Sequence, residues 1–357
     1  MSYGAGPSPL EYDYSAPQRA SVIVLVVCGC ISLAAILGLF VFMIFKTRKY
    51  RRTHVLAYIV CLLLANTMQS WGTILSLKWV VLGKILDGLH CYSQGGIKQG
   101  GNIAAAWFSF IISAHLFNLM FLRRETPRAV AWAAIAFGWS SVFLIVFIGP
   151  VAIQTEARGH YFGISGLWCW ITPAYRTEQL CLEDLFQFVS VVFSFVLHVL
   201  TFLRVRGNLL HVDGRWSIRF DESWRLSLGR DFTDSAMLEV VRHMVWFPVA
   251  FAVTIIPVAI VRAPGLWGEM NAVPLWLQAL AGAIFDLSGL INVVLFLGVR
   301  RLFPAPEDTP EFEVDRSVAE KNNGASKEEI VKNFGVTPFL LSQPAKQDIE
   351  AQPEPRV

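Results

Sequence analysis

Long uncharged runs recur along the chain and dominate its pattern of hydrophobic and polar positions. The first, residues 22–45, holds 24 residues without Asp, Glu, Lys or Arg. A helix rises 1.5 Å per residue, so a run of this length crosses the ~30 Å hydrocarbon core of a bilayer. Six further long hydrophobic segments follow, and four of them carry a few charged residues. The seven predicted spans are about 22–45, 55–77, 93–122, 129–153, 180–203, 238–262 and 273–299. The pattern predicts an all-α membrane protein, a seven-transmembrane helix bundle.

The third and fourth spans differ in polarity. The third begins with a glycine-rich polar stretch and keeps polar groups along its length: Gln94, Lys98, Gln99, Asn102, Ser109, Ser113, His115 and Asn118. A helix that faces lipid does not keep so many polar groups, so we expect the third span at the centre of the bundle. The fourth span has few polar residues beyond Ser140 and Ser141, which predicts a peripheral position.

The two ends of the chain differ from the middle in composition. Residues 1–20 are rich in Tyr, Pro, Ser and Gly, and residues 303–357 are rich in Pro and carry 11 acidic against 6 basic residues. Both segments lack hydrophobic periodicity, so we expect two disordered tails flanking a membrane domain of residues 21–302. The whole chain is 54% hydrophobic and only 16% charged, and its bases lie beside the spans rather than in one patch. Nucleic-acid binding is therefore not expected.

Basic residues predict the orientation of the spans. With the amino terminus outside and the carboxyl terminus in the cytoplasm, the inner loops hold 16 Lys and Arg and the outer segments hold 7. This excess follows the positive-inside rule. We expect a multi-pass protein of the plasma membrane that contacts membrane lipid on its outer faces.

Three cysteines fall on the outer side of this arrangement. Cys91 lies just before the third span, Cys169 lies in the long outer loop, and Cys181 lies at the outer start of the fifth span. Outside the cell is an oxidising environment, so we predict a Cys91–Cys169 disulfide, with Cys181 unpaired. By loop entropy, closing this 78-residue separation contributes on the order of 4 kcal/mol. The other cysteines lie within spans, as small buried thiols: Cys28, Cys30 and Cys61.

Ionisable and strongly polar groups inside spans are candidates for function. The seventh span contains one charged residue, Asp286, with Asn292 six residues later. Two interpretations stay open: contact with a ligand or ion, or a structural polar core. The members of that predicted polar core are Asn66, His115, Asn118, Asp286 and Asn292. The histidines lack metal-binding spacing, and we expect no metal and no cofactor.

We expect a ligand site at the outer ends of helices three, five, six and seven. Spacings of four place Gln94, Lys98 and Asn102 on one helical face. Lys98 has possible partners in Glu183 and Asp184. Glu183, Trp168 and Trp170 are further candidates for ligand contact, although tryptophans near span ends also form interfacial belts. The alternative interpretation is that Gln94, Lys98 and Asn102 are only solvated at the outer end of the third helix.

Pro248 and Pro257 are expected to kink the sixth helix, and a kink can supply a hinge. The loop 204–236 joins helices five and six at the predicted cytoplasmic face. Candidates for contact with a cytoplasmic partner protein lie in or near it and at the inner end of the third helix: Arg123, Arg124, Arg225, Arg230, Glu239 and Arg242. The loop mixes bases and acids, and attraction of its bases to anionic lipid is the alternative interpretation.

Several motifs resemble one known family. The run C-x-x-Q-G-x-x-K-Q-G-G-N at 91–102, L-W-C-W-I at 167–171, M-x-x-x-P-x-x-F at 244–251 and S-G-L-I-N-x-x-x-F at 288–296 resemble fungal seven-transmembrane receptors. These are the carbon-source-sensing and cyclic-AMP-receptor-like G-protein-coupled receptors. The resemblance covers roughly residues 20–302. It implies a receptor that senses an extracellular small molecule, activates a heterotrimeric G protein through Gα, and feeds nutrient or cyclic-AMP signalling.

Some features separate the chain from other classes of membrane protein. The third span ends in LMFLRRET, without the Asp-Arg-Tyr of the rhodopsin-like class. A retinal protein needs a Schiff-base lysine in the seventh span, and residues 273–299 contain none. A seven-helix transporter of small solutes is the main alternative, although no repeat relates the two halves of the chain. A membrane enzyme is a weaker alternative, and we expect no catalytic activity.

Overall fold

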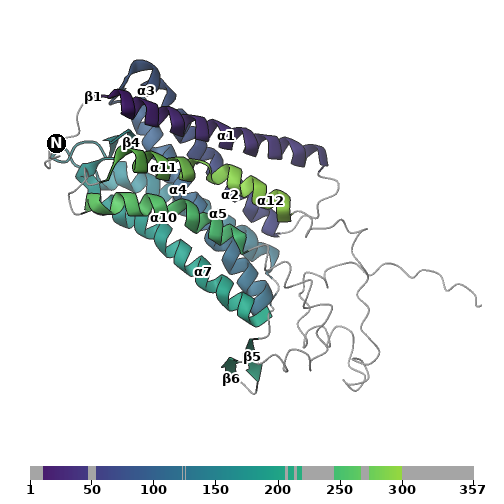
Figure 1. The fold of residues 1–357 in the computed structure, drawn as a ribbon. Coiled ribbons are helices and arrows are strands. Elements are labelled where there is room, and N and C mark those ends of the chain that lie inside the picture. Colours follow the sequence, from purple (N-terminus) through teal and green to yellow (C-terminus); the bar gives the residue numbers. More distant parts are fainter. Residues whose placement is uncertain are drawn as a thin grey trace, which may run out of the picture.

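The fold was analysed in a computed structural model of the chain. It describes residues 11–46, 54–122, 124, 126–205, 208–212, 215–218, 245–266 and 273–299. Within these residues it contains seven helical segments long and apolar enough to cross a membrane. They are Ala16–Phe45, His54–Leu82, Leu89–Phe121, Arg128–Ile153, Pro173–Arg204, Trp246–Ala263 and Leu275–Gly298. The predicted seven-helix fold class is confirmed, and the helices run side by side as one bundle (Figure 1).

Several spans combine regular helices with short π-helical or 3-10 segments. The regular helices are α1 (Ala16–Lys46), α2 (His54–Ile74), α3 (Leu77–Leu82), α4 (Leu89–Leu116), α5 (Arg128–Ile148), α6 (Arg176–Gln179), α7 (Leu185–Val205), α10 (Trp246–Leu266), α11 (Leu275–Asp286) and α12 (Ser288–Val299). Wider π-helical turns occupy Phe117–Phe121 (η2), Gly149–Ile153 (η3) and Leu180–Asp184 (η5), and a 3-10 turn occupies Pro173–Tyr175 (η4). The fifth helical segment therefore begins before the predicted start at residue 180.

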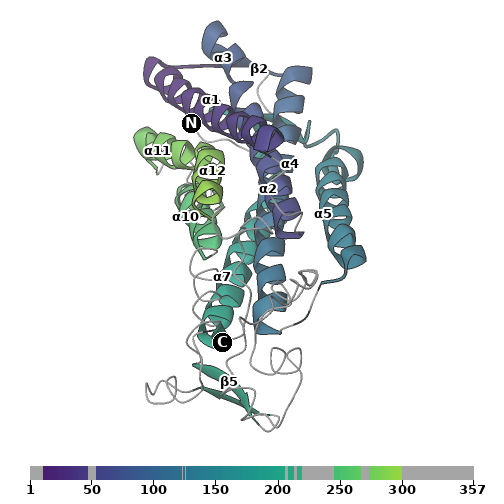
Figure 2. The same ribbon diagram turned by 90° about the vertical axis from the view of Figure 1, so that its right-hand side faces the viewer.

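Helix α4 lies at the centre of the bundle, where it contacts α2, α5, α7 and α10. In its most apolar stretch 72% of the residues are buried, against 17% for the span that contains α5. Figure 2 shows α5 at one edge of the bundle. The polarity of the two sequences explains the difference, because buried polar groups in α4 find partners on α2 and in η5, whereas α5 offers mainly apolar side chains to lipid. The expected central and peripheral positions of these helices are confirmed.

A disulfide between Cys91 and Cys169 joins the start of α4 to a β-hairpin. The hairpin pairs β3 (Phe162–Ser165) with β4 (Trp168–Ile171), and its two-residue turn contains Gly166 at φ +75°, a conformation that glycine adopts without strain. The predicted pairing is confirmed, and Cys181 is a free thiol. We call this end of the bundle the disulfide end. The hairpin of β5 (Leu209–Val212) and β6 (Arg215–Ile218) lies at the opposite end (Figure 1).

The amino-terminal segment corrects one expectation. Residues 1–20 were predicted to be disordered, yet Glu11–Asp13 forms strand β1 and α1 begins at Ala16. Strand β1 pairs antiparallel with β2 (Lys84–Leu86), directly after α3. The reason is tertiary: Tyr12 and Tyr14 pack against a buried cluster at the disulfide end, which a local composition argument does not detect. Residues 1–10 lie outside the described part of the chain.

The seventh span is interrupted in its middle. Helix α11 ends at Asp286, Leu287 has φ −81° and ψ 0°, and α12 begins at Ser288. The interruption lies beside the one charged residue of this span. Helix α10, in contrast, runs through both Pro248 and Pro257 as one helical segment, so the predicted hinge there stays a prediction.

Candidate ligand-binding site

A cavity of about 430 Å³ opens at the disulfide end. Its walls come from the amino-terminal segment, α1, α4, the β3–β4 hairpin, the start of the fifth span, α10 and α11. Its lining is partly apolar and includes several charged and polar side chains, among them Lys98, Asn102, Asp184, Arg262, Gln278 and Asp286. A cavity of this size matches the sites that hold small molecules in proteins.

Lys98 forms the charged floor of the cavity together with Asp286. The Nζ of Lys98 donates a hydrogen bond of 3.0 Å to the Oγ1 of Thr73, which donates one of 2.7 Å to the Oδ1 of Asp286. Lys98 is 9% exposed and Asp286 is 5% exposed. Within the described residues, no hydrogen bond uses the other two N–H groups of Lys98 or the Oδ2 of Asp286. This group therefore offers spare donors and a spare acceptor to the cavity.

Glu183 is the centre of a second, fully bonded group. Its Oε1 accepts a 2.6 Å bond from Asn102 and its Oε2 accepts a 2.6 Å bond from Trp170. The guanidinium of Arg262 lies 3.7 Å from Glu183 and 2.9 Å from Asp184, and it stacks 4.1 Å from the ring centre of Trp170. These contacts tie helices three, five and six to the hairpin.

This arrangement corrects the expected partner of Lys98. Glu183 and Asp184 were possible partners of Lys98, but the ion pairs of both carboxylates are with Arg262. The reason is position: Arg262 lies on α10, which faces the start of the fifth span, whereas Lys98 points toward α2 and α11. Asn102 lines the cavity, but its Oδ1 accepts from Gln69 at 3.0 Å while its amide nitrogen donates to Glu183.

Gln94 has no free hydrogen-bonding capacity. Its amide nitrogen donates to the carbonyl of Gly72 (2.9 Å) and to Ser76 (2.7 Å), and its oxygen accepts from Trp79 (2.9 Å). The backbone N–H of Cys169 is 3.4 Å from that oxygen. Gln94 is completely buried and does not line the cavity. The prediction that it contacts ligand finds no support here, because the shared face of α4 packs against α2 at this level.

Trp168 and Trp170 enter the cavity from strand β4. The Nζ of Lys98 lies 5.1 Å from the ring centre of Trp168, within the range of a cation–π interaction. Two features fix the strand. One is the disulfide at Cys169. The other is the segment before the hairpin, which is fastened to the start of the fifth span.

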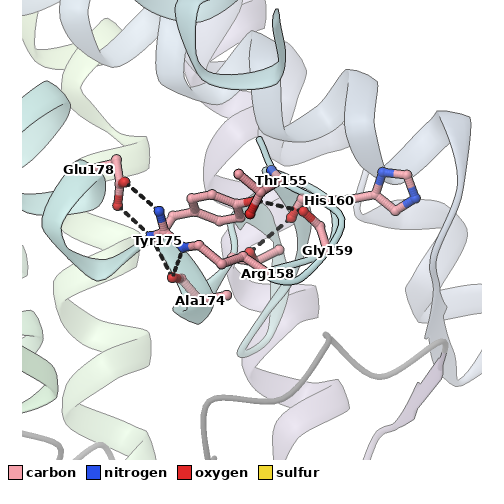
Figure 3. A network of polar contacts seen from close by, with 8 residues as sticks. Thr155, Arg158, Gly159, His160, Ala174, Tyr175 and Glu178 are labelled. Atoms are coloured by element: carbon pink, nitrogen blue, oxygen red, sulfur yellow. Dashed lines mark hydrogen bonds and ion pairs between the residues drawn. The ribbon is translucent and has the colours of Figure 1, made fainter. Parts of the chain in front are cut away.

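Arg158 and Tyr175 hold the segment before the hairpin against the start of the fifth span (Figure 3). Arg158 donates two 2.9 Å bonds to the carboxylate of Glu178 and bonds of 3.0 and 2.7 Å to the carbonyl of Ala174. Its guanidinium stacks 3.9 Å from the ring centre of Tyr175, whose hydroxyl donates 2.6 Å to the carbonyl of Gly159. A bidentate arginine pair has a fixed geometry, so this network orients the hairpin over the bundle.

A third polar group lies deeper, below the cavity. Ser288 at the start of α12 is within 3.3 Å of the side-chain oxygens of Asn66 and Gln69. A small void beside them is lined by Asn66, Ser288 and Asn292. Of the residues predicted for the polar core, Asn66 and Asn292 thus line the same void, whereas Asp286 bonds to Thr73 in the floor of the cavity.

His115 and Asn118 do not belong to that core. Asn118 donates to Thr126 (3.0 Å), and the Nδ1 of His115 lies 3.3 Å from the same hydroxyl. The ring of His115 also packs against Tyr58. At 1.5 Å per residue, Asn118 is about 24 Å along the helix from Asn102. The side chains of His115 and Asn118 therefore lie at the end of the bundle opposite the disulfide. They fasten the segment after η2 instead.

The candidates for G-protein contact are mostly outside the described residues, namely Arg123, Arg225, Arg230, Glu239 and Arg242. Arg124 is described and exposed, and its backbone bonds with Asn118. The structure therefore leaves this part of the sequence analysis as a prediction.

Sequence reasoning missed four residues that line the cavity or bond to its charged floor: Thr73, Arg262, Tyr12 and Gln18. Thr73 carries no signal of its own, because a threonine inside an apolar span is ordinary. Arg262 had a signal: it is a single base at the end of a span, opposite two consecutive acids at the start of another. Tyr12 and Gln18 lie in a segment whose composition indicated disorder.

Comparisons with known proteins support the fold. A solved structure of squid rhodopsin is similar, with a TM-score of 0.62, 14% sequence identity, and coverage of 88% of this chain and 94% of that chain. No protein-family profile and no curated protein matches the chain. At this identity the likeness establishes the fold alone. The chain is a multi-pass membrane protein with a rhodopsin-like seven-helix fold.

Proposed function

We propose that this chain is a G-protein-coupled receptor of the plasma membrane. Its amino terminus lies outside the cell, a small extracellular molecule binds in the cavity at the disulfide end, and a heterotrimeric G protein binds at the opposite end. The main observation that supports this proposal is the polar floor of the cavity. There Lys98 and Asp286 keep unused hydrogen-bonding atoms inside a rhodopsin-like bundle. Buried ionisable groups with spare capacity are costly in a membrane and are retained for function.

The chemistry of the floor favours a ligand with a group that both accepts and donates hydrogen bonds. Such a group accepts from Lys98 and donates to the Oδ2 of Asp286 without adding a net charge to the site. The faces of Trp168 and Phe285 and the apolar parts of α10 and α11 surround the rest of the ligand. Glu183 and Gln94 position these walls and make no contact with ligand.

Activation follows from the way Arg262 joins α10 to the fifth span. An agonist that alters the contacts of Trp170 or Arg262 favours one packing of α10 over another, which shifts a population of states already present. Pro248 offers a point about which the inner end of α10 swings outward. The loop 204–236 then contributes to a groove for a helix of Gα, the helix-in-groove mode of recognition. The motif resemblance to fungal nutrient and cyclic-AMP-type receptors supports cyclic-AMP signalling as the readout.

The test is a ligand screen in cells that express the chain, read out by cyclic AMP and by nucleotide exchange on Gα. An agonist is expected to stimulate exchange, and Lys98→Gln is expected to weaken its potency at unchanged surface expression. Deleting residues 211–230 should abolish stimulated exchange while ligand binding persists. Full exchange after that deletion would assign coupling to another surface.

A transporter of small solutes is the second candidate, and one observation favours it. Helix seven is interrupted at Leu287, beside Asp286, and discontinuous helices near charged residues occur in many transporters. Uptake of the same screened compounds, measured in the same cells, separates the two functions. Accumulation of a compound without stimulated nucleotide exchange would replace the receptor proposal with a transporter.

A further inference from the structure

The amino-terminal segment 11–19, which we call the strap, crosses the disulfide end of the bundle. Its strand β1 pairs with β2 from Glu11 to Asp13, opposite Leu86 to Lys84. The side chains of Tyr12, Ser15 and Gln18 line the cavity. The strap is thus one wall of the same cavity that holds Lys98 and Asp286.

Specific bonds hold the strap in place along its whole length. The backbone N–H of Tyr14 donates 3.0 Å to Gly83, and its hydroxyl donates 2.7 Å to the carbonyl of Leu167 in the hairpin turn. The Nε of Arg19 donates 2.9 Å to the carbonyl of Val80. The salt bridge between Glu11 and Lys84 is exposed and adds little.

The inner side of the strap also shares its packing with the disulfide. Tyr12 and Tyr14 pack against a cluster formed by Trp79, Ile85, Ile164 and the two bonded cysteines. Burial raises the pKa of the Tyr14 hydroxyl, so this group stays a neutral donor throughout the physiological range. The Oε1 of Gln18 accepts from the backbone of Ser15 and its nitrogen donates to the hydroxyl of Tyr12, which fixes the orientation of both cavity-lining side chains.

We propose that the strap is the outer wall of the ligand site and controls the exchange of ligand between the cavity and the solvent. Tyr12 and Gln18 then contribute to selecting which molecules enter. The role in ligand exchange rests on the proposed receptor function, whereas the covering of the cavity by the strap does not. The shared packing further predicts that loss of the Cys91–Cys169 bond loosens the strap.

The test measures access to the cavity without a ligand. In a background in which Cys28, Cys30, Cys61 and Cys181 are replaced by serine, Gln278→Cys places a reporter thiol on the cavity wall. Its rate of modification by 2-(trimethylammonium)ethyl methanethiosulfonate is compared between the full chain and a chain lacking residues 1–13. Glu156→Cys, at an exposed position before the hairpin, is the matched control reporter.

Removal of residues 1–13, which include strand β1 and Tyr12, is expected to accelerate modification of the cavity reporter at least tenfold and to leave the control reporter unchanged. Because the deletion can impair folding, the double variant Tyr14→Phe and Arg19→Gln is measured in parallel, with an expected acceleration of several-fold. Equal rates at the cavity reporter in all folded variants, with the disulfide intact by peptide mapping, would overturn the proposal. Faster modification together with a failed agonist screen would retain the strap as a cover and remove only the receptor function.

Discussion

Two polar groups lie one helical turn apart on α4 and differ in how completely they are bonded. Asn102 belongs to the Glu183 group, in which both carboxylate oxygens have short bonds and Arg262 balances the charge. Lys98 belongs to the group with Thr73 and Asp286, in which donors and an acceptor stay unused among the described residues. A saturated buried group stabilises one packing of the bundle. An unsaturated one in the wall of a cavity is suited to a ligand.

The largest loss of stability is expected when Glu183, the common acceptor of the fully bonded group, is replaced. Glu183→Ala removes the acceptor of Asn102 and Trp170 and leaves Arg262 with Asp184 alone. Each buried donor left unsatisfied costs about 1–3 kcal/mol, so removing the common acceptor of two donors is expected to have the largest cost. Thermal unfolding of the purified protein in nanodiscs should show this loss. Glu156→Ala, an exposed control, should change the unfolding free energy by less than about 0.5 kcal/mol.

Gln94 is a second buried side chain with all its hydrogen bonds made, and it is uncharged. Replacing it therefore tests whether such a group stabilises the fold without the effect of a lost charge. Gln94→Leu keeps the volume but leaves the indole N–H of Trp79 and the hydroxyl of Ser76 without their partner. Unsatisfied buried groups of this kind cost about 1–3 kcal/mol, so a lower unfolding temperature and reduced surface expression are expected. Agonist potency per folded receptor should stay unchanged. A large fall in potency with normal stability would instead make Gln94 a ligand contact.

Close packing of α2 on α4 places Gln69 and Thr73 within hydrogen-bonding distance of Asn102 and Lys98. A Cβ added at Gly101 would lie 2.8 Å from the backbone nitrogen of Gln69 and 3.2 Å from the carbonyl of Ala65, atoms that cannot rotate away. We expect Gly101→Ala to destabilise the fold by about 1–3 kcal/mol. Gly38→Ala is the matched control, because nothing lies within 4 Å of its added Cβ. This control should be neutral or stabilising by up to ~1 kcal/mol in the same unfolding assay.

The smallest effect on stability is expected in the unsaturated group. Replacing both of its charges, by Lys98→Gln with Asp286→Asn, removes a buried cation and a buried anion together. Such paired replacement is often close to neutral, and we expect a change in unfolding free energy below about 1 kcal/mol. A loss comparable to that of Glu183→Ala would show that this group is structural, and the contrast between the two groups would disappear.

Hydrophobic runs of about twenty residues or more predicted the spans, because crossing a bilayer imposes a minimum length on every helix. The Cys91–Cys169 bond was predictable from the side on which both thiols fall. The spacing of Gln94, Lys98 and Asn102 correctly placed them on one face of α4. It did not distinguish a face that packs on α2 from one that opens to a cavity, since both are polar.

What the sequence missed depends on tertiary partners. The pairing of Arg262 with Glu183 and Asp184 requires knowing which helices are neighbours. The order of the strap depends on Tyr12 and Tyr14 finding an apolar surface formed by residues far along the chain. Local composition carries neither kind of information.

Agonist-stimulated nucleotide exchange on purified Gα tests the central claim most directly, with the agonist supplied by the screen. The account predicts that Lys98→Gln raises the half-maximal agonist concentration at least tenfold and leaves the maximal exchange rate unchanged. It predicts the same direction for Asp286→Asn. Unchanged agonist potency in both variants, at normal surface expression, would contradict the assignment of this cavity as the ligand site.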